Sequence, residues 1–156
     1  MANWTSTWVM VKGTPKSLEK FNTILKGEDK RQKWLPRTEL IWSDTSKGEF
    51  CVQCAWSVMS CWLNGYTQEI RTKPEMFYQM TPQRAKLVRT ILELSKELGL
   101  ELKILSEEPG CCFIEFYHID NGKLLEEQTY DTEGFEDIEA ETEALYEELE
   151  LTKMVW

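Results

Sequence analysis

Residues 3–27, NWTSTWVMVKGTPKSLEKFNTILKG, decide the start of the fold, because a strand pattern is followed at once by a helix pattern. Residues 3–12 alternate and predict a β-strand with successive side chains on opposite faces. A helix is predicted next, since Thr14 suits its N-cap, Pro15 its first turn and Gly27 the position just past its end. The strand faces are Trp4, Ser6, Trp8 and Met10 against Thr5, Thr7, Val9 and Val11, and the helical stripe is Leu18, Phe21, Ile24 and Leu25.

Two hairpins are indicated further along the chain. The turn-forming stretch DTSKG, residues 44–48, lies between two strand-like runs and predicts the first. Asn121-Gly122 predicts the second, because this dipeptide favours the positive φ angles that a two-residue hairpin turn needs. The predicted strands after the first are 39–43, 49–56, 100–105, 112–119 and 123–130.

A single second helix is predicted over residues 82–98, with Thr81 as its cap and Gly99 at its end. Its shared face is Ala85, Val88, Leu92 and Ser95. The element order is then β-α-β-β-α-β followed by β-β-α. This order predicts an α+β fold, a ferredoxin-like (βαββαβ) antiparallel sheet with helices on one face, extended by C-terminal β-strand residues and an acidic α-helix. We expect one domain over residues 1–156, with an ordered insertion at about 58–80 and the acidic helix at about 136–150.

Composition excludes several classes of protein. No stretch approaches the roughly 20 consecutive apolar residues of a membrane span, and residues 1–13 lack the features of a cleaved leader. The five cysteines, an odd number with Cys111 next to Cys112, do not suggest a disulfide framework and are expected to be free thiols in a reducing compartment. We therefore expect a cytoplasmic protein with no membrane partner. The sequence leaves its oligomeric state open.

Charge is divided unevenly along the chain. Residues 1–78 carry 11 Lys and Arg against 8 Asp and Glu, whereas residues 79–156 carry 7 against 19. Between residues 121 and 150 there are 12 acids and a single base, Lys123. Such a field repels nucleic acid from the C-terminal half and favours basic partners.

The acidic segment is expected to be a docked helix rather than a disordered tail, because apolar residues within it recur at helical spacing. Glu139, Glu143 and Glu147 are like charges at i, i+4, an arrangement that disfavours the helix. General solubility and recognition of a basic partner both account for this pattern. The apolar stripe is Ile138, Thr142, Leu145 and Leu149, and the predicted partner-binding surface is Glu136, Asp137, Glu139, Glu143, Glu147, Glu148 and Glu150.

An anion-binding site is the alternative. Arg84, Lys86 and Arg89 lie in the first turns of the predicted second helix, where cations oppose the helix dipole and a bound anion would relieve the conflict. Basic residues within 26–37 could extend this patch. The alternative function is thus a nucleotide- or RNA-binding domain that uses the basic N-terminal half and the start of the second helix.

Zinc binding is a further alternative, with Cys51, Cys54, Cys111, Cys112 and His118 as the ligands. The spacing of the first pair disfavours it. On a strand, residues three apart point to opposite faces, whereas zinc sites place such a pair in a tight turn. We therefore predict core cysteines, no metal and no cofactor.

Catalytic machinery is not predicted either. His118, the only histidine, could act as a base beside Cys111 or Cys112, but its place near the end of a strand favours a half-buried structural role. Glu107-Glu108 precedes Pro-Gly and is interpreted as part of a turn. The sequence has no Gly-rich phosphate loop, Ser-centred elbow or two-histidine metal motif. We therefore predict that the protein is not an enzyme and has no catalytic residues.

Short motifs resemble the YubB-type ferredoxin-like proteins of phages and plasmids. Asn3-Trp4 precedes an alternating strand, and Gly13-Thr14-Pro15 begins a helix, as in that family. Further matches are Ala55-Trp56-Ser57, Leu100-Glu101-Leu102, Glu107-Glu108-Pro109-Gly110-Cys111 and Asn121-Gly122. The chain departs from the family at Thr5, where a cysteine is usual, and at residues 58–80, which intervene before the helix. The resemblance implies a ferredoxin-like fold and a small accessory protein of a mobile genetic element, and it supplies no catalytic residues.

The function predicted from the sequence is therefore that of a non-enzymatic accessory protein of a phage or plasmid. It is expected to bind and modulate a basic host or defence protein through its acidic surface.

Overall fold

The computed structural model describes residues 3–63 and 65–156, and these form one antiparallel sheet of six strands in the order β2-β3-β1-β4-β5-β6. The strands are β1 (Trp4–Lys12), β2 (Thr38–Asp44), β3 (Glu49–Ala55), β4 (Glu101–Glu108), β5 (Phe113–Asp120) and β6 (Lys123–Asp131). The predicted α+β class is confirmed. The sheet differs from that of a simple ferredoxin-like fold, because β5 and β6 extend it beyond β4.

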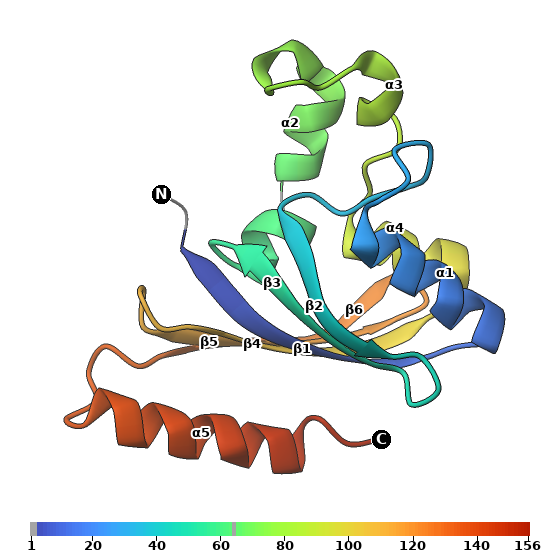
Figure 1. The fold of residues 1–156 in the computed structure, drawn as a ribbon. Coiled ribbons are helices and arrows are strands. Elements are labelled where there is room, and N and C mark those ends of the chain that lie inside the picture. Colours follow the sequence, from blue (N-terminus) through green and yellow to red (C-terminus); the bar gives the residue numbers. More distant parts are fainter. Residues whose placement is uncertain (1–2, 64) are drawn as a thin grey trace.

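Helices lie on both faces of this sheet (Figure 1). On one face are α1 (Pro15–Lys26) and α4 (Ile91–Leu98), and along the other lies α5 (Ile138–Thr152). The chain between β3 and α4 holds the short elements η1 (Met59–Leu63), α2 (Tyr66–Thr72), η2 (Pro74–Met76) and α3 (Pro82–Ala85). Figure 1 places α2 and α3 at the end of the molecule remote from α5.

The start of the chain forms as predicted. β1 alternates between buried and more exposed side chains, and it pairs with β3 on one side and β4 on the other. The side chain of Thr14 accepts a hydrogen bond from the Ser17 amide, and Gly27 ends α1 in the left-handed conformation at φ 65°. These local signals fix the two ends of α1.

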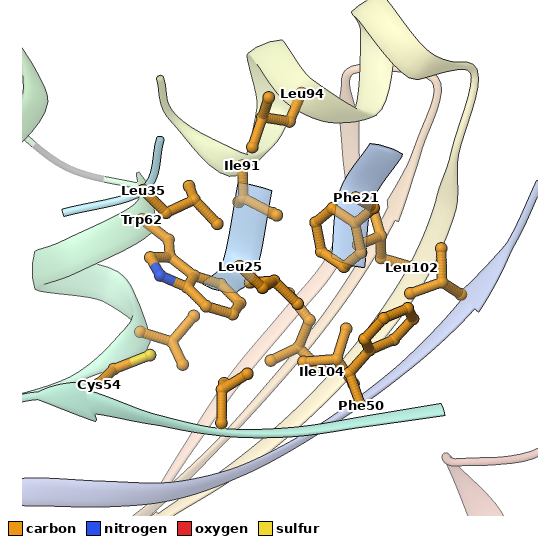
Figure 2. Packing of buried hydrophobic residues seen from close by; sticks show 14 of the residues in the cluster. Phe21, Leu25, Leu35, Phe50, Cys54, Trp62, Ile91, Leu94, Leu102 and Ile104 are labelled. Carbon is orange, nitrogen blue, oxygen red and sulfur yellow. The ribbon is translucent and has the colours of Figure 1, made fainter. Parts of the chain in front are cut away.

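The main core lies between the sheet and the layer formed by α1 and α4 (Figure 2). Phe21 of α1 meets Phe50 of β3 edge to face, with ring centroids 5.1 Å apart. Ile91 and Leu94 of α4 are fully buried in the same cluster. Trp62 of η1 is also completely buried there, so the first part of the predicted insertion at about 58–80 contributes to the core, and residue 64 of that insertion lies outside the described residues.

A buried carboxylate ties this insertion to the sheet. Glu115 of β5 accepts hydrogen bonds from the backbone amides of Val58 and Met59, at 3.0 and 3.2 Å, and from the Tyr117 hydroxyl at 2.7 Å. Burial raises the pKa of Glu115. Because its oxygens have protein donors, this acidic group fits the interior as a structural anchor.

The predicted single helix over residues 82–98 is wrong. α3 ends at Ala85, and α4 begins only after Thr90, whose side chain and Glu93 form a reciprocal capping box. Between them the backbone pairs with Trp34, whose amide donates to the Leu87 carbonyl while its own carbonyl accepts from the Arg89 amide. These long-range hydrogen bonds replace the helical ones.

The opposite face of the sheet is covered in part by α5. Leu149 is buried against a second cluster that contains Leu105, Ile114 and Phe116. Docking of the acidic segment as a helix is therefore confirmed, with bounds 138–152 rather than 136–150. One part of the expected stripe is wrong, because Ile138 begins the helix and is 44% exposed.

Candidate functional site

A groove of about 980 Å³ lies between α5 and the turn that joins β4 to β5. Among the described residues its lining includes six glutamates and no Lys, Arg or His. We call it the acidic groove and define it by Glu107, Glu108, Glu139, Glu143, Glu147 and Glu150. Phe113 and Tyr146 add aromatic surface to the same lining.

One wall of the acidic groove is a face of α5. Glu139, Glu143 and Glu147 follow one another at intervals of four residues, so they share one side of the helix. The buried side chains of Thr142 and Leu149 fix how α5 lies on the sheet. The helical spacing seen in the sequence thus becomes a row of carboxylates beside a packed stripe.

The other wall comes from the end of β4 and was not predicted. The interpretation of Glu107-Glu108 as turn residues is wrong, because both belong to β4. Glu108 is only 2% exposed, and its carboxylate accepts hydrogen bonds from the backbone amides of Gly110 and Cys111. Glu108 therefore shapes the β4–β5 turn while also lining the acidic groove.

Negative charges on the two walls raise the pKa values of groups that lie between them. Burial, and then the charge of Glu143, hold the pKa of Glu107 above its ordinary value. The pKa of Tyr146 is raised by burial and by the charges of Glu150 and Glu107. Like charges face one another across the groove, so a cation bound between them would be stabilised by both walls.

Three residues of the predicted partner-binding surface lie outside the acidic groove: Glu136, Asp137 and Glu148. Asp137 stabilises the start of α5, because it is the N-cap and its side chain accepts a hydrogen bond from the Ala140 amide at 3.1 Å. The other four predicted residues, Glu139, Glu143, Glu147 and Glu150, line the acidic groove together with Glu107 and Glu108.

The predicted anion-binding residues do not gather at a helix start. The N-terminus of α4 is occupied by the capping box of Thr90 and Glu93, and Glu93 also pairs with Arg71 at 2.8 Å. Arg89 pairs with Glu97 at 3.0 Å. Its guanidinium also donates to the Lys86 carbonyl at 2.8 Å. Because the predicted helix is broken, the three residues do not share one helix start.

Arg84 and Lys86 line a second hollow, together with two basic residues from the loop after α1. We call it the basic hollow and define it by Lys30, Arg31, Tyr78, Arg84 and Lys86. Of the basic residues within 26–37 that were expected to extend the patch, Lys30 and Arg31 line this hollow.

The five zinc candidates are dispersed. Cys54 is buried and Cys51 only partly so, as their spacing on β3 predicts. The expectation of core cysteines is wrong for Cys111, which is exposed, and Cys112 is only partly buried. Among the described residues no three His, Cys, Asp or Glu side chains gather as a metal site. Burial raises the pKa of Cys54, and that of Cys61 to about 11. These two thiols are therefore protonated at neutral pH and poor nucleophiles.

His118 is half-buried, as predicted, and its Nε2 lies 2.8 Å from a carboxylate oxygen of Glu101. It stands near the end of β5, whereas Cys111 and Cys112 precede the start of that strand. Five residues of strand span about 17 Å, so His118 is not a base beside either cysteine. Cys112 lines the acidic groove without a histidine partner there among the described residues.

Comparison of the chain with protein-family models, with curated proteins and with solved structures gave no match. Within residues 3–63 and 65–156, no helix has the length and apolar character needed to cross a membrane.

Proposed function

We propose that this chain is a non-enzymatic accessory protein of a phage or plasmid that binds and modulates a basic host or defence protein through the acidic groove. One observation carries the proposal: six glutamates line a groove of about 980 Å³, with no basic side chain beside them among the described residues. The partner would insert lysine or arginine side chains between α5 and the end of β4.

The electrostatics of the groove support binding of a cationic segment. Glu107 and Glu143 repel one another, and a positive charge between them would remove that repulsion and gain two attractive interactions. Rows of like charge also steer an oppositely charged protein during its approach. The complex is therefore expected to form quickly at low ionic strength and to weaken as salt is added.

The biological setting is part of the same proposal and rests on the resemblance carried by Asn3-Trp4, Gly13-Thr14-Pro15 and Ala55-Trp56-Ser57. So does the finer fold assignment, a ferredoxin-like unit built from β1, α1, β2, β3, α4 and β4. The order β2-β3-β1-β4, and the position of α1 and α4 on one face, support that assignment. A cytoplasmic location also belongs to this proposal.

Capture of partners by the full chain tests the proposed function. The test variant carries Glu139→Lys, Glu143→Lys and Glu147→Lys, which reverse the helical wall of the groove. A matched control reverses three exposed glutamates outside the groove: Glu133→Lys, Glu141→Lys and Glu148→Lys. Both variants have the same net charge, so only the position of the change differs.

We expect a basic protein from the native host to bind the wild type and the control and to be lost from the groove variant. Its dissociation constant, measured with purified proteins, should rise at least about tenfold between low and high salt. Equal binding by the groove variant and the control, or a complex indifferent to salt, would overturn the proposed function. Thermal unfolding of all three proteins checks that they are folded.

A further inference from the structure

The basic hollow is assembled from two distant parts of the chain, at the end of the molecule that carries α3 (Figure 1). Lys30 and Arg31 come from the loop after α1, whereas Arg84 and Lys86 come from α3 and the residue that caps its end. The hollow has a volume of about 720 Å³, and no Asp or Glu of the described residues lines it, although Arg31 pairs with the neighbouring Asp29 at 3.1 Å. Its size is typical of a small-ligand site, and its charge selects an anion.

Arg84 is held in place inside this surface. Its guanidinium lies over the ring of Trp34, 4.5 Å from the ring centre, and the Trp34 indole N–H donates to the Arg84 carbonyl at 2.9 Å. Trp34 in turn packs with the cluster of Ile70, Ala85 and Val88. The cation therefore has a fixed orientation before any ligand arrives, which lowers the entropic cost of binding.

Arg84 also has no counter-ion among the residues that the structure describes. No carboxylate of the described residues lies within 4.0 Å of its guanidinium, and its Nη1 is buried without a hydrogen-bond partner there. Burial lowers the pKa of Arg84. A partly desolvated guanidinium gains from an acceptor that is itself charged, and phosphate oxygens fit its planar donors.

Tyr78 adds a flat apolar surface to the same hollow. It is 90% exposed, so it makes little packing contribution to the domain, and it lies on the lining with Arg84 and Lys86. Cations combined with an exposed aromatic ring are the elements that bind the phosphate and the base of a nucleotide.

We propose that the basic hollow binds a nucleoside phosphate, either free or as a unit of a single strand. The phosphate contacts Arg84 and Lys86, and the base stacks on Tyr78. This site is independent of the acidic groove, which lies against the other face of the sheet and repels polyanions. A strand would therefore be held at the α3 end of the molecule.

Calorimetric titration of the full chain at low salt tests this proposal with defined probes. Adenosine monophosphate is compared with adenosine and with inorganic phosphate, which carry the base or the charge alone. We expect the nucleotide to bind at least about tenfold more tightly than either, because stacking and charge pairing add. An eight-residue oligoadenylate distinguishes the sources: tighter binding than the mononucleotide assigns the site to a strand, and equal binding assigns it to a free nucleotide.

Variants locate the site. Tyr78→Ala should weaken nucleotide binding about tenfold and leave phosphate binding unchanged, whereas Met76→Ala, a second exposed apolar residue outside the hollow, should have no effect. Lys86→Gln should weaken both ligands, and Lys73→Gln, which removes an exposed charge outside the hollow, should weaken neither. Arg84→Gln should weaken nucleotide binding most. If that variant unfolds, Lys86→Gln still tests the site, because Lys86 is exposed and its substitution should leave the fold intact.

The proposal is overturned if neither the mononucleotide nor the oligonucleotide binds in a saturable way at low salt. It is equally overturned if inorganic phosphate binds as tightly as the nucleotide, or if Tyr78→Ala and Lys86→Gln match their controls. Because every probe here is an anion or a nucleoside, these outcomes leave the proposed function of the acidic groove unaffected.

Discussion

The acidic groove and the basic hollow are charged hollows of similar size, yet they are assembled in different ways. Four of the six groove glutamates lie within α5, where local helical spacing aligns them. The basic hollow depends on contacts between remote segments, as in the hydrogen bond between Trp34 and Arg84, which are 50 positions apart. The helical repeat within α5 aligns most of the charges of the acidic groove, whereas tertiary packing brings together those of the basic hollow.

The two regions also hold their charges differently. The groove carboxylates on α5 are mostly exposed and hydrated, and their mutual repulsion is screened by salt. Arg84 is partly desolvated against an aromatic ring and has no carboxylate partner among the described residues. Figure 1 shows α5 and α3 at opposite ends, so the sheet keeps the opposite charges apart. The opposite charges are thus separated in space, although Arg84 and Lys86 belong to the acidic half of the sequence.

Removal of Trp34 should break the basic hollow alone and have the largest effect on stability. Trp34→Ala deletes the ring under Arg84 and a side chain packed against Ile70 and Val88, so unfolding should cost about 3 kcal/mol less. Urea unfolding measures this loss. Trp42→Ala, at a tryptophan that is 49% exposed, is the matched control and should cost far less. Similar losses in both variants would contradict the role given to Trp34.

Removal of Glu108 should break the strand wall of the acidic groove. Glu108→Ala leaves the amides of Gly110 and Cys111 without their carboxylate acceptor, a loss of about 2 kcal/mol. Chemical unfolding measures the change, with Glu139→Ala as a control within about 0.5 kcal/mol of the wild type, because Glu139 is exposed. Equal effects at the two positions would show that burial of Glu108 does not matter.

Neutralising Glu107 should change the free energy of unfolding least, and it should stabilise the protein where the two preceding substitutions destabilise it. Its pKa is raised in the folded protein, so the ionised form is less stable there than in the unfolded chain, and Glu107→Gln should stabilise the protein at pH 7 by less than about 1 kcal/mol. The gain should disappear as the pH falls below the ordinary value of 4.5, where the native carboxyl is neutral too. Thermal unfolding at pH 7 and pH 3.5 measures both; a gain independent of pH would exclude the electrostatic cause.

Several elements could be predicted from the sequence because their signals are local. Thr14, Pro15 and Gly27 bound α1 as expected, and Asn121 and Gly122 form the turn between β5 and β6 with φ angles of 46° and 83°. The glutamate row of α5 follows from the same kind of regularity. In each case residues within one or two turns determine the conformation.

The largest failed prediction, the single helix over residues 82–98, involves a partner that is distant in sequence. Residues 82–98 have a helical period, but the backbone between Ala85 and Thr90 forms hydrogen bonds with the backbone of Trp34 instead of continuing the helix. The pattern Thr90-x-x-Glu93, a capping box, was the one local signal that could have placed the true start of α4. No local pattern shows that Glu107 faces Glu143, or that Lys30 lies near Arg84.

The sequence by itself determined the α+β class, the order of the strands along the chain and the acidic face of α5, because periodicity and capping act over a few residues. Only the tertiary structure decided that α5 lies opposite α1 and α4, that β4 supplies the second wall of the groove, and that a basic hollow exists. The physical reason is that burial and electrostatic contact depend on the distance between residues in space, and this distance cannot be read from their separation in the sequence.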